Sequence, residues 1–302
     1  MKFPSVYAII VNWNGKADTL ECLSSLAKVR NKYQLLSVVV VDNGSTDGSI
    51  REIKVKFPWV HCIDEGKNLG FSGGNNIGIS YAEEKKAEYI WLLNNDTVVD
   101  TDVLSLLSSF QDTSVGAAGS KIYFYKGYEF HKNRYQQKDL GHVLWYAGGI
   151  IDWKNMLASH RGVDEVDKGQ YESEMKTDFI TGCSFFIRTS VIKQVGLLDE
   201  SYFMYMEDLD YSLRIQRLGL KTVYNPASVL WHKNASSSGG SGSRLHEYYQ
   251  TRNRLKIGMK YAPLRTKLAL LREGVRILAG ASSIKKRAVF DFLKGTMGQY
   301  HE

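Results

Sequence analysis

Short runs rich in β-branched residues alternate with helix-length amphipathic segments over the first 125 residues, and this alternation constrains the fold more than any other feature. The expected strands are Tyr7–Val11, Ser37–Val41, Val60–Ile63, Ile90–Leu93 and Gly119–Phe124. The expected helices are Ala17–Ala27, Gly48–Phe57, Gly74–Glu84 and Asp102–Phe110. Such alternation is typical of βαβ units around a mostly parallel sheet flanked by helices, so we expect an α/β fold.

The regular pattern fades after Tyr125 into a polar, aromatic segment that extends to about Lys176, which we expect to line a binding surface. Further elements are expected at Phe179–Arg188, Tyr205–Leu218, Lys221–Tyr224 and Val229–Trp231. Ser236–Ser243 contains only Ser and Gly, so it is expected to be a flexible linker or a loop that orders over a ligand. These features predict a domain over residues 1–243, with halves at about 1–125 and 126–243, and a basic helical tail over 244–302.

The net charge of +7 is concentrated in the tail. From Arg244 to Glu302 there are 13 Lys or Arg and 4 Asp or Glu, against totals of 39 and 32 for the chain. The rest of the chain is slightly acidic, which disfavours a nucleic-acid groove across the fold.

The remaining composition argues for a globular cytoplasmic protein. The three cysteines, Cys22, Cys62 and Cys183, lack C-x-x-C spacing, so neither a zinc site nor a disulfide framework is expected. The first residues lack the apolar run of a signal peptide, and no stretch reaches the roughly 18 apolar residues of a membrane-spanning helix. Any membrane contact is therefore expected to be peripheral.

Polar residues follow four of the expected strands directly. The four segments are Asn12-Trp13-Asn14-Gly15, Asp42-Asn43-Gly44-Ser45, Asn68-Leu69-Gly70 and Asn94-Asn95-Asp96. Ligands of open α/β sheets bind outside the carboxyl ends of the strands, so four such segments in succession predict a site at one edge of the sheet.

These segments resemble the motifs of family-2 glycosyltransferases, whose nucleotide-binding half has the GT-A fold. Later matches are Gly182-Cys183-Ser184, Glu207-Asp208-Leu209-Asp210 with Arg214, and Trp231-His232-Lys233. The resemblance runs in order from about Val6 to Arg254. It implies an enzyme that moves a sugar from a nucleoside-diphosphate donor to an acceptor hydroxyl.

The resemblance implies a set of nucleotide-binding residues. They are Asn12, Asn14, Asp42, Asn43, Asn68, Gly70, Asn76, Asn94, Asn95 and Arg252. Asp42 is expected to accept the imino N–H of a pyrimidine base, or else to cap the following helix. Arg252 is expected to clamp the diphosphate, or else to lie on a basic helix face.

Asn94-Asn95-Asp96 stands where the family carries its D-x-D motif, with an amide in place of the first carboxylate. The resemblance implies that Asp96 and His232 bind a divalent cation together with the donor diphosphate. Oxygen ligands suit Mg²⁺, and an imidazole ligand makes Mn²⁺ equally suitable. Because an amide replaces one of the two carboxylates of the D-x-D motif, the cation has fewer negatively charged ligands. We therefore expect its affinity to depend on bound nucleotide.

The acidic run that opens the helix after Tyr205 supplies the general base in enzymes of this family. Asp208 is the expected base, with Glu207 as the alternative. Asp210 is expected to pair with Arg214, four residues later on the same helical face. Proton removal from the acceptor as its oxygen attacks the anomeric carbon inverts the anomeric configuration.

The tail contains an apolar stripe at helical spacing, flanked by arginines. Its members are Leu264, Leu268, Leu271, Val275 and Leu278, with Arg265, Arg272 and Arg276 beside them. The stripe is expected to pack against the domain, to form a homodimer with a second subunit, or to contact an anionic membrane at its inner face.

Among family members, the motifs are most similar to those of bacterial rhamnosyltransferases that build cell-surface polysaccharides. The resemblance implies dTDP-rhamnose as donor and a glycan or lipid-linked acceptor. A UDP-hexose-dependent transferase of the same fold and a non-catalytic scaffold that binds nucleotide or membrane are the alternatives. A sugar-phosphate nucleotidyltransferase is disfavoured, because Asn12-Trp13-Asn14-Gly15 is not a phosphate loop rich in glycine and basic residues.

Overall fold

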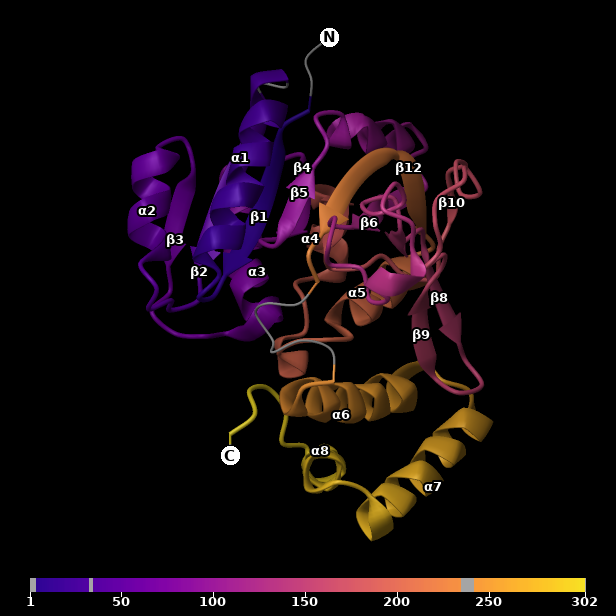
Figure 1. Ribbon diagram of the computed structural model, residues 1–302. Coiled ribbons are helices and arrows are strands. Elements are labelled where there is room, and N and C mark those ends of the chain that lie inside the picture. The colour runs from indigo at the N-terminus through magenta and orange to yellow at the C-terminus, as the bar shows by residue number, and fades with distance from the viewer. Residues whose placement is uncertain (1–3, 33–34, 235–241, 302) are drawn as a thin grey trace.

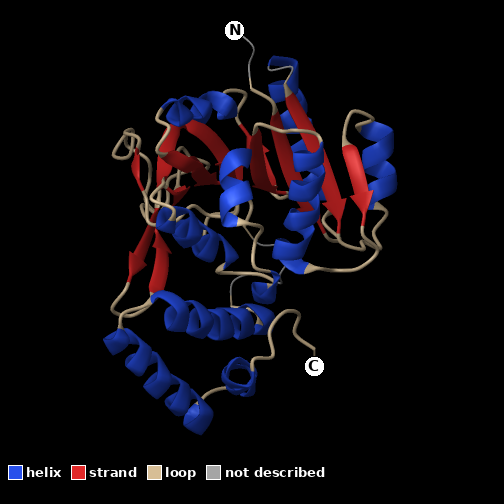
Figure 2. Cartoon of the chain, turned by 180° about the vertical axis from the view of Figure 1, so that it is seen from behind, coloured by secondary structure: helices blue, strands red, loops and turns tan. Residues whose placement is uncertain are grey.

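The computed structural model describes residues 4–32, 35–234 and 242–301. The central sheet has helices on both faces, and three further helices lie beyond the end of the sheet toward which β1 and β2 run (Figures 1 and 2). Most of Ser236–Ser243, the expected linker or closing loop, lies outside the described residues.

The N-terminal half of the sheet is parallel, as the alternating pattern predicts. Its strands are β1 (Val6–Asn12), β2 (Leu36–Asp42), β3 (His61–Asp64) and β4 (Tyr89–Asn94), in the order β4-β1-β2-β3. The connecting helices are α1 (Lys16–Lys32), α2 (Ser49–Lys56) and α3 (Gly70–Glu84). In this register Asn12 lies opposite Asp42, so the polar strand ends meet at one edge.

The second half of the sheet is mixed. The long path continues through β11 (Ser184–Arg188), β6 (Val115–Phe124), β12 (Lys221–His232) and β10 (Met175–Lys176), with β5 (Thr97–Val99) and β7 (Leu144–Tyr146) paired at its side. Strand β11 is antiparallel to both β4 and β6. The two strands expected within 221–231 form one strand, β12, whose register against β6 shifts between Asn225 and Val229.

Several elements between the strands differ from expectation. The segment expected to be a helix at Asp102–Phe110 is a 3₁₀ helix, η1 (Val103–Gln111). The polar segment 126–176 contains the short 3₁₀ turn η2 (Lys132–Arg134) and an antiparallel hairpin of β8 (Gly149–Asp152) and β9 (Leu157–His160). Next come α4 (Thr189–Val195), the 3₁₀ turn η3 (Glu200–Tyr202) and α5 (Glu207–Arg217).

Two apolar cores lie on opposite faces of the sheet, because successive strand side chains point to opposite sides. Ile10 belongs to the core that includes α1, and Ile9 to the core that includes α3, α4 and α5. Helix α3 packs closely on β1 because glycine occupies the contact. A Cβ atom on Gly78 would lie 2.2 Å from Cγ2 of Ile9.

The tail forms three helices, α6 (Arg244–Tyr261), α7 (Leu264–Gly280) and α8 (Ser283–Lys294). Helix α7 buries Thr266, Leu270 and Gly274, whereas Leu264 is 73% exposed and Val275 is 67% exposed. The expectation that the apolar stripe packs against the chain's own domain is therefore wrong, because the opposite face of α7 makes that contact. In the described part of the chain, no helix is both long and apolar enough to span a bilayer.

The close contact at Gly78 predicts a loss of stability in Gly78→Ala. Alanine favours a helix by about 1 kcal/mol over glycine, but overpacking typically costs about 1–3 kcal/mol, and a 2.2 Å approach to a β-branched side chain lies at the severe end. We expect the free energy of unfolding to fall by about 2 kcal/mol in urea denaturation. Gly280→Ala is the control, because nothing lies within 4 Å of its added Cβ; equal stability of the two variants would contradict the packing argument.

Candidate active site

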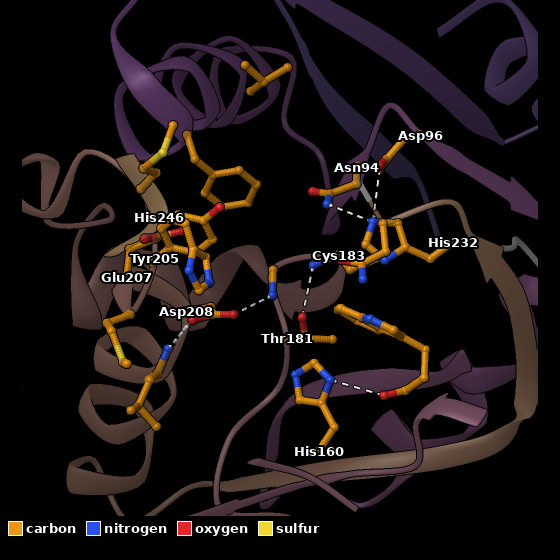
Figure 3. Close-up of a pocket in the computed structure, with 18 of the residues that line it drawn as sticks. Asn94, Asp96, His160, Thr181, Cys183, Tyr205, Glu207, Asp208, His232 and His246 are labelled. Atoms are coloured by element: carbon orange, nitrogen blue, oxygen red, sulfur yellow. Dashed lines mark hydrogen bonds and ion pairs between the residues drawn. The ribbon is translucent and has the colours of Figure 1, made fainter. Parts of the chain in front are cut away.

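A cavity of about 550 Å³ opens at the carboxyl ends of β1 and β4, beside the start of α5 (Figure 3). Most of the strand-end segments expected to form a site contribute to its wall. The lining includes Asn43, Asn68, Gly70, Asn94, Asn95, Asp96, Glu207, Asp208 and His232. The structure thus brings together residues that are up to 189 positions apart in the sequence, from Asn43 to His232.

Asp96 and His232 are neighbours because their strands pair. Strand β5 runs antiparallel to β12 with Thr97 opposite His232, and the Lys233 amide donates to the Asp96 carbonyl over 3.0 Å. As a result, His232 Nε2 lies 3.0 Å from Asp96 Oδ1, and both side chains are buried. Asn94 Nδ2 lies 3.5 Å from the same imidazole nitrogen.

This pair fits two adjacent positions around one divalent cation. Ligands about 2.1 Å from an octahedral ion lie about 3 Å apart in neighbouring positions, which matches the separation of the carboxylate oxygen and the imidazole nitrogen. Among the described residues, no cluster of three or more His, Cys, Asp or Glu is placed to hold a metal. Further ligands would therefore have to come from a donor diphosphate, water or amide oxygens.

The two acidic residues at the start of α5 have different surroundings. Asp208 Oδ2 accepts the Gly182 amide over 2.8 Å, and Oδ1 accepts the Leu209 amide over 2.8 Å. Glu207 is buried, and its Oε2 has no hydrogen-bond partner among the described residues. Figure 3 shows both carboxylates beside the cavity.

The two carboxyl groups consequently differ in pKa. Burial raises the pKa of Glu207 well above its usual range, and the charge of Asp208 raises it further. Burial also raises the pKa of Asp208, but the amide hydrogen bonds from Gly182 and Leu209 oppose that rise. Hydrogen bonds of this kind favour the charged form, so Asp208 ionises before Glu207.

Asp96 and Asp208 both influence the buried Cys183 thiol, and the labelled residue Cys183 lies between the two aspartates in the view of Figure 3. Burial raises the pKa of Cys183 well above its usual range, and the charges of Asp96 and Asp208 are among the further causes. Asp96 and Asp208 therefore lie close enough to influence the same buried group.

Asn43, Asn68 and Gly70 form one wall of the cavity. Asn43 Nδ2 donates to the Gly70 carbonyl over 2.9 Å, and Asn68 Oδ1 accepts the Gly70 amide over 2.8 Å. Gly70 has a φ of 70°, and a Cβ there would lie 2.4 Å from the Phe203 carbonyl oxygen. Glycine is required here by the backbone of a neighbouring loop.

Asn12, Asn14 and Asp42 do not line the cavity. Asn12 Nδ2 donates to Asp42 Oδ2 over 2.7 Å, and Asp42 Oδ1 accepts the Ser45 amide over 2.7 Å. Asn14 Oδ1 accepts the Thr46 amide over 2.8 Å. These bonds tie the loops after β1 and β2 together. Asp42 does not cap α2, because Asp47 accepts the first helical amide.

Asn76 and Arg252 also lie away from the cavity lining. Asn76 exchanges two hydrogen bonds of 3.0 Å with the backbone of Leu198, which fastens α3 to the segment before α5. Arg252 is 0% exposed, so the alternative of an exposed basic helix face is wrong. Its guanidinium donates to the carbonyls of Tyr202 and Gly298 rather than facing the cavity. Asp210 pairs with Arg214 over 2.8 Å, as predicted.

Sequence reasoning missed several residues around the cavity. Gly182 supplies the amide that anchors Asp208, and the polar, aromatic segment 126–176 supplies Trp145 and His160. The Trp145 ring lies edge-on to both His160 and His232, at 4.3 and 4.5 Å between centroids. Burial lowers the pKa of His160 to about 4, so its imidazole is neutral near pH 7. The polar, aromatic composition of residues 126–176 was the sequence feature that indicated a contribution of this segment to the cavity wall.

A family model described as glycosyltransferase-like family 2 matches residues 4–258. The chain belongs to this family. The match covers every residue of the Asp96–His232 and Glu207–Asp208 pairs, and the predicted family and enzyme class, glycosyltransferase, are confirmed.

Three curated relatives are each 27% identical to the chain. The low-salt glycan biosynthesis hexosyltransferase Agl10 of Haloferax volcanii matches over 69% of this chain and 61% of its own length. The N-acetylglucosaminyl-diphospho-decaprenol L-rhamnosyltransferase of Mycobacterium tuberculosis matches over 68% of each chain. The dTDP-rhamnosyl transferase RfbF of Shigella flexneri matches over 82% of this chain and 78% of its own. The chain thus spans less than two thirds of the length of Agl10 and more than two thirds of the length of each of the other two relatives.

Solved structures support the fold assignment. A mannosyltransferase of Pyrobaculum calidifontis, in complex with GDP-Man and Mn²⁺, aligns with a TM-score of 0.57 at 16% identity, over 97% of this chain and 75% of its own. GalNAc-T7, with UDP, GalNAc and Mn²⁺, aligns with a TM-score of 0.67 at 17% identity, over 98% of this chain and 55% of its own. The expected GT-A type of α/β fold is confirmed.

The raised pKa of Glu207 predicts that stability falls as pH rises. Above the ordinary pKa of glutamate, the unfolded chain releases a proton that folded Glu207 keeps, so the free energy of unfolding declines until the folded group ionises. Glu207→Gln removes this penalty. We expect its Tm to match wild type near pH 4 and to exceed it at pH 8 by at least about 2 °C.

Thermal melts from pH 4 to pH 8 measure the difference. The control is Glu84→Gln, at an exposed position on α3, which should leave the pH dependence unchanged. A Glu207→Gln variant that melts at or below the wild-type temperature at pH 8 would show that Glu207 is not held protonated in the folded protein.

Proposed function

We propose that the chain transfers a rhamnosyl group from dTDP-rhamnose to a hydroxyl of a lipid-linked glycan, with inversion at the anomeric carbon. The observation that supports it best is the joint presence, around one cavity, of the Asp96–His232 pair and the amide-bonded carboxyl group of Asp208. The relatives from Mycobacterium tuberculosis and Shigella flexneri, which are named as rhamnosyltransferases, support rhamnose as the sugar.

Asp208 is the proposed general base. Its amide hydrogen bonds favour the charged form, while burial keeps its proton affinity above that of an exposed aspartate. Asp208 takes the proton of the acceptor hydroxyl as that oxygen forms a bond to the anomeric carbon. The bond from that carbon to the diphosphate breaks, and dTDP leaves with the electron pair. Glu207, held neutral, does not compete as the base.

Asp96 and His232 are the proposed ligands of Mn²⁺ or Mg²⁺, which when bound neutralises the negative charge of the diphosphate. Asn43, Asn68, Asn94 and Asn95 are the proposed donor-side residues, since their side chains reach the cavity. Asn12, Asn14, Asp42 and Asn76 would act on the nucleotide through the loops that they hold. Arg252 is not proposed to bind the nucleotide, because its guanidinium donates to the backbone carbonyls of Tyr202 and Gly298 and does not line the cavity.

The test is release of nucleoside diphosphate from dTDP-, UDP- and GDP-sugars with Mn²⁺ or Mg²⁺. We expect release from dTDP-rhamnose that depends on the metal, with kcat reduced about 10²–10⁴-fold in Asp208→Asn and metal dependence lost in Asp96→Ala. Glu84→Gln is the surface control.

The other outcomes are decisive in different ways. Release from a UDP-hexose alone would replace rhamnose by that sugar and leave the site intact. Full activity of Asp208→Asn would reject Asp208 as the base. Absence of both turnover and nucleotide binding would favour the non-catalytic scaffold.

We also propose that α7 docks on an anionic bilayer, at the inner face of the cell membrane. Leu264, Leu268, Leu271, Val275 and Leu278 form an exposed stripe opposite the buried face of α7. Arg265, Arg272 and Arg276 flank it. The one acidic residue of α7, Glu273, is engaged by Arg254 of α6 at 2.6 Å. The flank is therefore basic, and a second copy docking through the same stripe would bring like charges together.

Flotation with phosphatidylglycerol vesicles tests this docking surface. We expect the protein to float with anionic but not with phosphatidylcholine vesicles, and Leu268→Asp/Val275→Asp to remain soluble. Val55→Asp is the control, because Val55 is an exposed apolar residue on α2, at 76%, and lies outside the stripe. Wild-type protein that stays in the soluble fraction would contradict membrane docking; a dimer that the double substitution dissociates would instead assign the stripe to a second copy.

A further inference from the structure

The loop that leads into Glu207 and Asp208 has a strained backbone. Phe203, Tyr205 and Met206 have φ values of 65°, 67° and 74°. Each is a bulky side chain in the left-handed region that normally suits glycine, and each such residue strains the backbone. A loop of this kind persists only where its surroundings fix it, so the contacts that hold residues 201–206 determine where Asp208 lies.

Asn253 of α6 supplies one set of these contacts. Its Nδ2 atom lies 3.0 Å from the Tyr202 carbonyl oxygen, 2.8 Å from that of Met204 and 2.9 Å from that of Tyr205. Asn253 is 0% exposed, so water does not compete for these bonds. One side-chain amide thus contacts three backbone carbonyl groups of the strained loop.

Arg252 completes the arrangement. Its Nε donates to Asn253 Oδ1 over 3.0 Å, which orients the amide so that its NH₂ group faces the loop. Its terminal nitrogens donate to the carbonyls of Tyr202 and Ser201, at 3.0 and 3.3 Å. A further bond of 2.8 Å reaches the Gly298 carbonyl near the C-terminus. The guanidinium thus donates to three backbone carbonyls and to the Asn253 side chain, which explains its burial with a positive charge.

The Phe203 side of the loop is held by the start of α3, next to the cavity wall that contains Gly70. The Phe203 carbonyl accepts the Phe71 amide over 2.8 Å, at the point where Gly70 permits close approach. The Phe203 ring stacks on Tyr249 of α6, with centroids 5.5 Å apart. The strained loop is therefore held between the start of α3 and α6.

Helix α6 also forms ion pairs with both ends of the longer segment, residues 199–210, that contains this loop. Lys256 Nζ donates to Asp199 Oδ2 over 2.7 Å, and Lys260 Nζ donates to Asp210 Oδ1 over 2.7 Å. Residues 252, 256 and 260 follow one another at i, i+4 and i+8, so they share one face of the helix. That face is directed at the segment that carries the acidic pair.

We propose that Arg252 and Asn253 are positioning residues, which hold the strained loop 201–206 so that Asp208 meets the Gly182 amide and faces the acceptor. The first helix of the tail is thereby part of the catalytic unit. This inference rests on the proposed role of Asp208 as the base, although the holding of the loop can be measured separately.

The test compares Arg252→Lys and Asn253→Asp with Arg254→Lys. Arg254 lies on the same helix and likewise donates to two backbone carbonyls, of Asn155 and Met156, but it does not touch the loop. We expect kcat to fall at least 30-fold in the first two variants with the donor KM changed less than twofold. Arg254→Lys should keep kcat within threefold of wild type.

The pH profile gives a readout that general destabilisation would not change. Loss of the Gly182 hydrogen bond would raise the pKa of Asp208, because that bond favours the charged form. The acidic limb of kcat/KM should therefore move to higher pH in Asn253→Asp and stay in place in Arg254→Lys.

Hydrogen–deuterium exchange of the full-length protein, without substrate, separates this inference from the proposed function. Exchange over residues 199–210 should rise in Arg252→Lys and Asn253→Asp, and not in Arg254→Lys. Unchanged exchange in the first two variants, or an equal fall of kcat in all three, would overturn the positioning role. A wild-type protein inactive with every donor would reject the proposed function, and exchange alone would then decide whether Arg252 and Asn253 hold the loop.

Discussion

The site depends on the pairing of a three-residue strand, β5, with the end of β12. This pairing sets Thr97 opposite His232 and bonds the Asp96 carbonyl to the Lys233 amide. Two side chains separated by 136 positions thereby come within 3.0 Å of each other. The antiparallel strand β11, inserted between β4 and β6, brings Gly182 to the same edge, where its amide anchors Asp208. The mixed half of the sheet therefore places the acidic groups, and the parallel half supplies the amide-rich wall of Asn43 and Asn68.

Burial gives these groups their different chemistry. Asp96 and His232 are buried beside each other. Burial raises the pKa of both Glu207 and Asp208, and the amides of Gly182 and Leu209 oppose that rise at Asp208. A carboxylate in a poorly hydrated site needs compensating donors, and only Asp208 of the α5 pair receives two. The same principle explains the tail, where the buried charge of Arg252 is offset by backbone carbonyls of the loop that precedes the base.

Much of the architecture could be predicted from the sequence, because β-branched runs and amphipathic periodicity report directly on burial. Strands β1, β2, β3 and β4 lie within one residue of their predicted bounds. The strand-end residues Asn43, Asn68, Asn94, Asn95 and Asp96 reach the cavity for the same reason, since topology alone sends the carboxyl ends of strands to one edge. Which partner a polar side chain finds is not periodic, so the contacts of Asn76 and Arg252 could not be predicted. Positive φ at Phe203, Tyr205 and Met206 has no signature in residue type, and the β8–β9 hairpin lacks clear alternation.

In the proposed metal site, Asp96 and His232 supply too few ligands to hold a cation by themselves, and a donor diphosphate would complete the coordination. Calorimetric titration of Mn²⁺ into the protein, with and without saturating dTDP, measures this directly. We expect weak Mn²⁺ binding without nucleotide, an affinity at least tenfold higher with dTDP, and loss of that gain in His232→Ala. Equal Mn²⁺ affinity with and without dTDP, or a nucleotide effect that survives in His232→Ala, would contradict it.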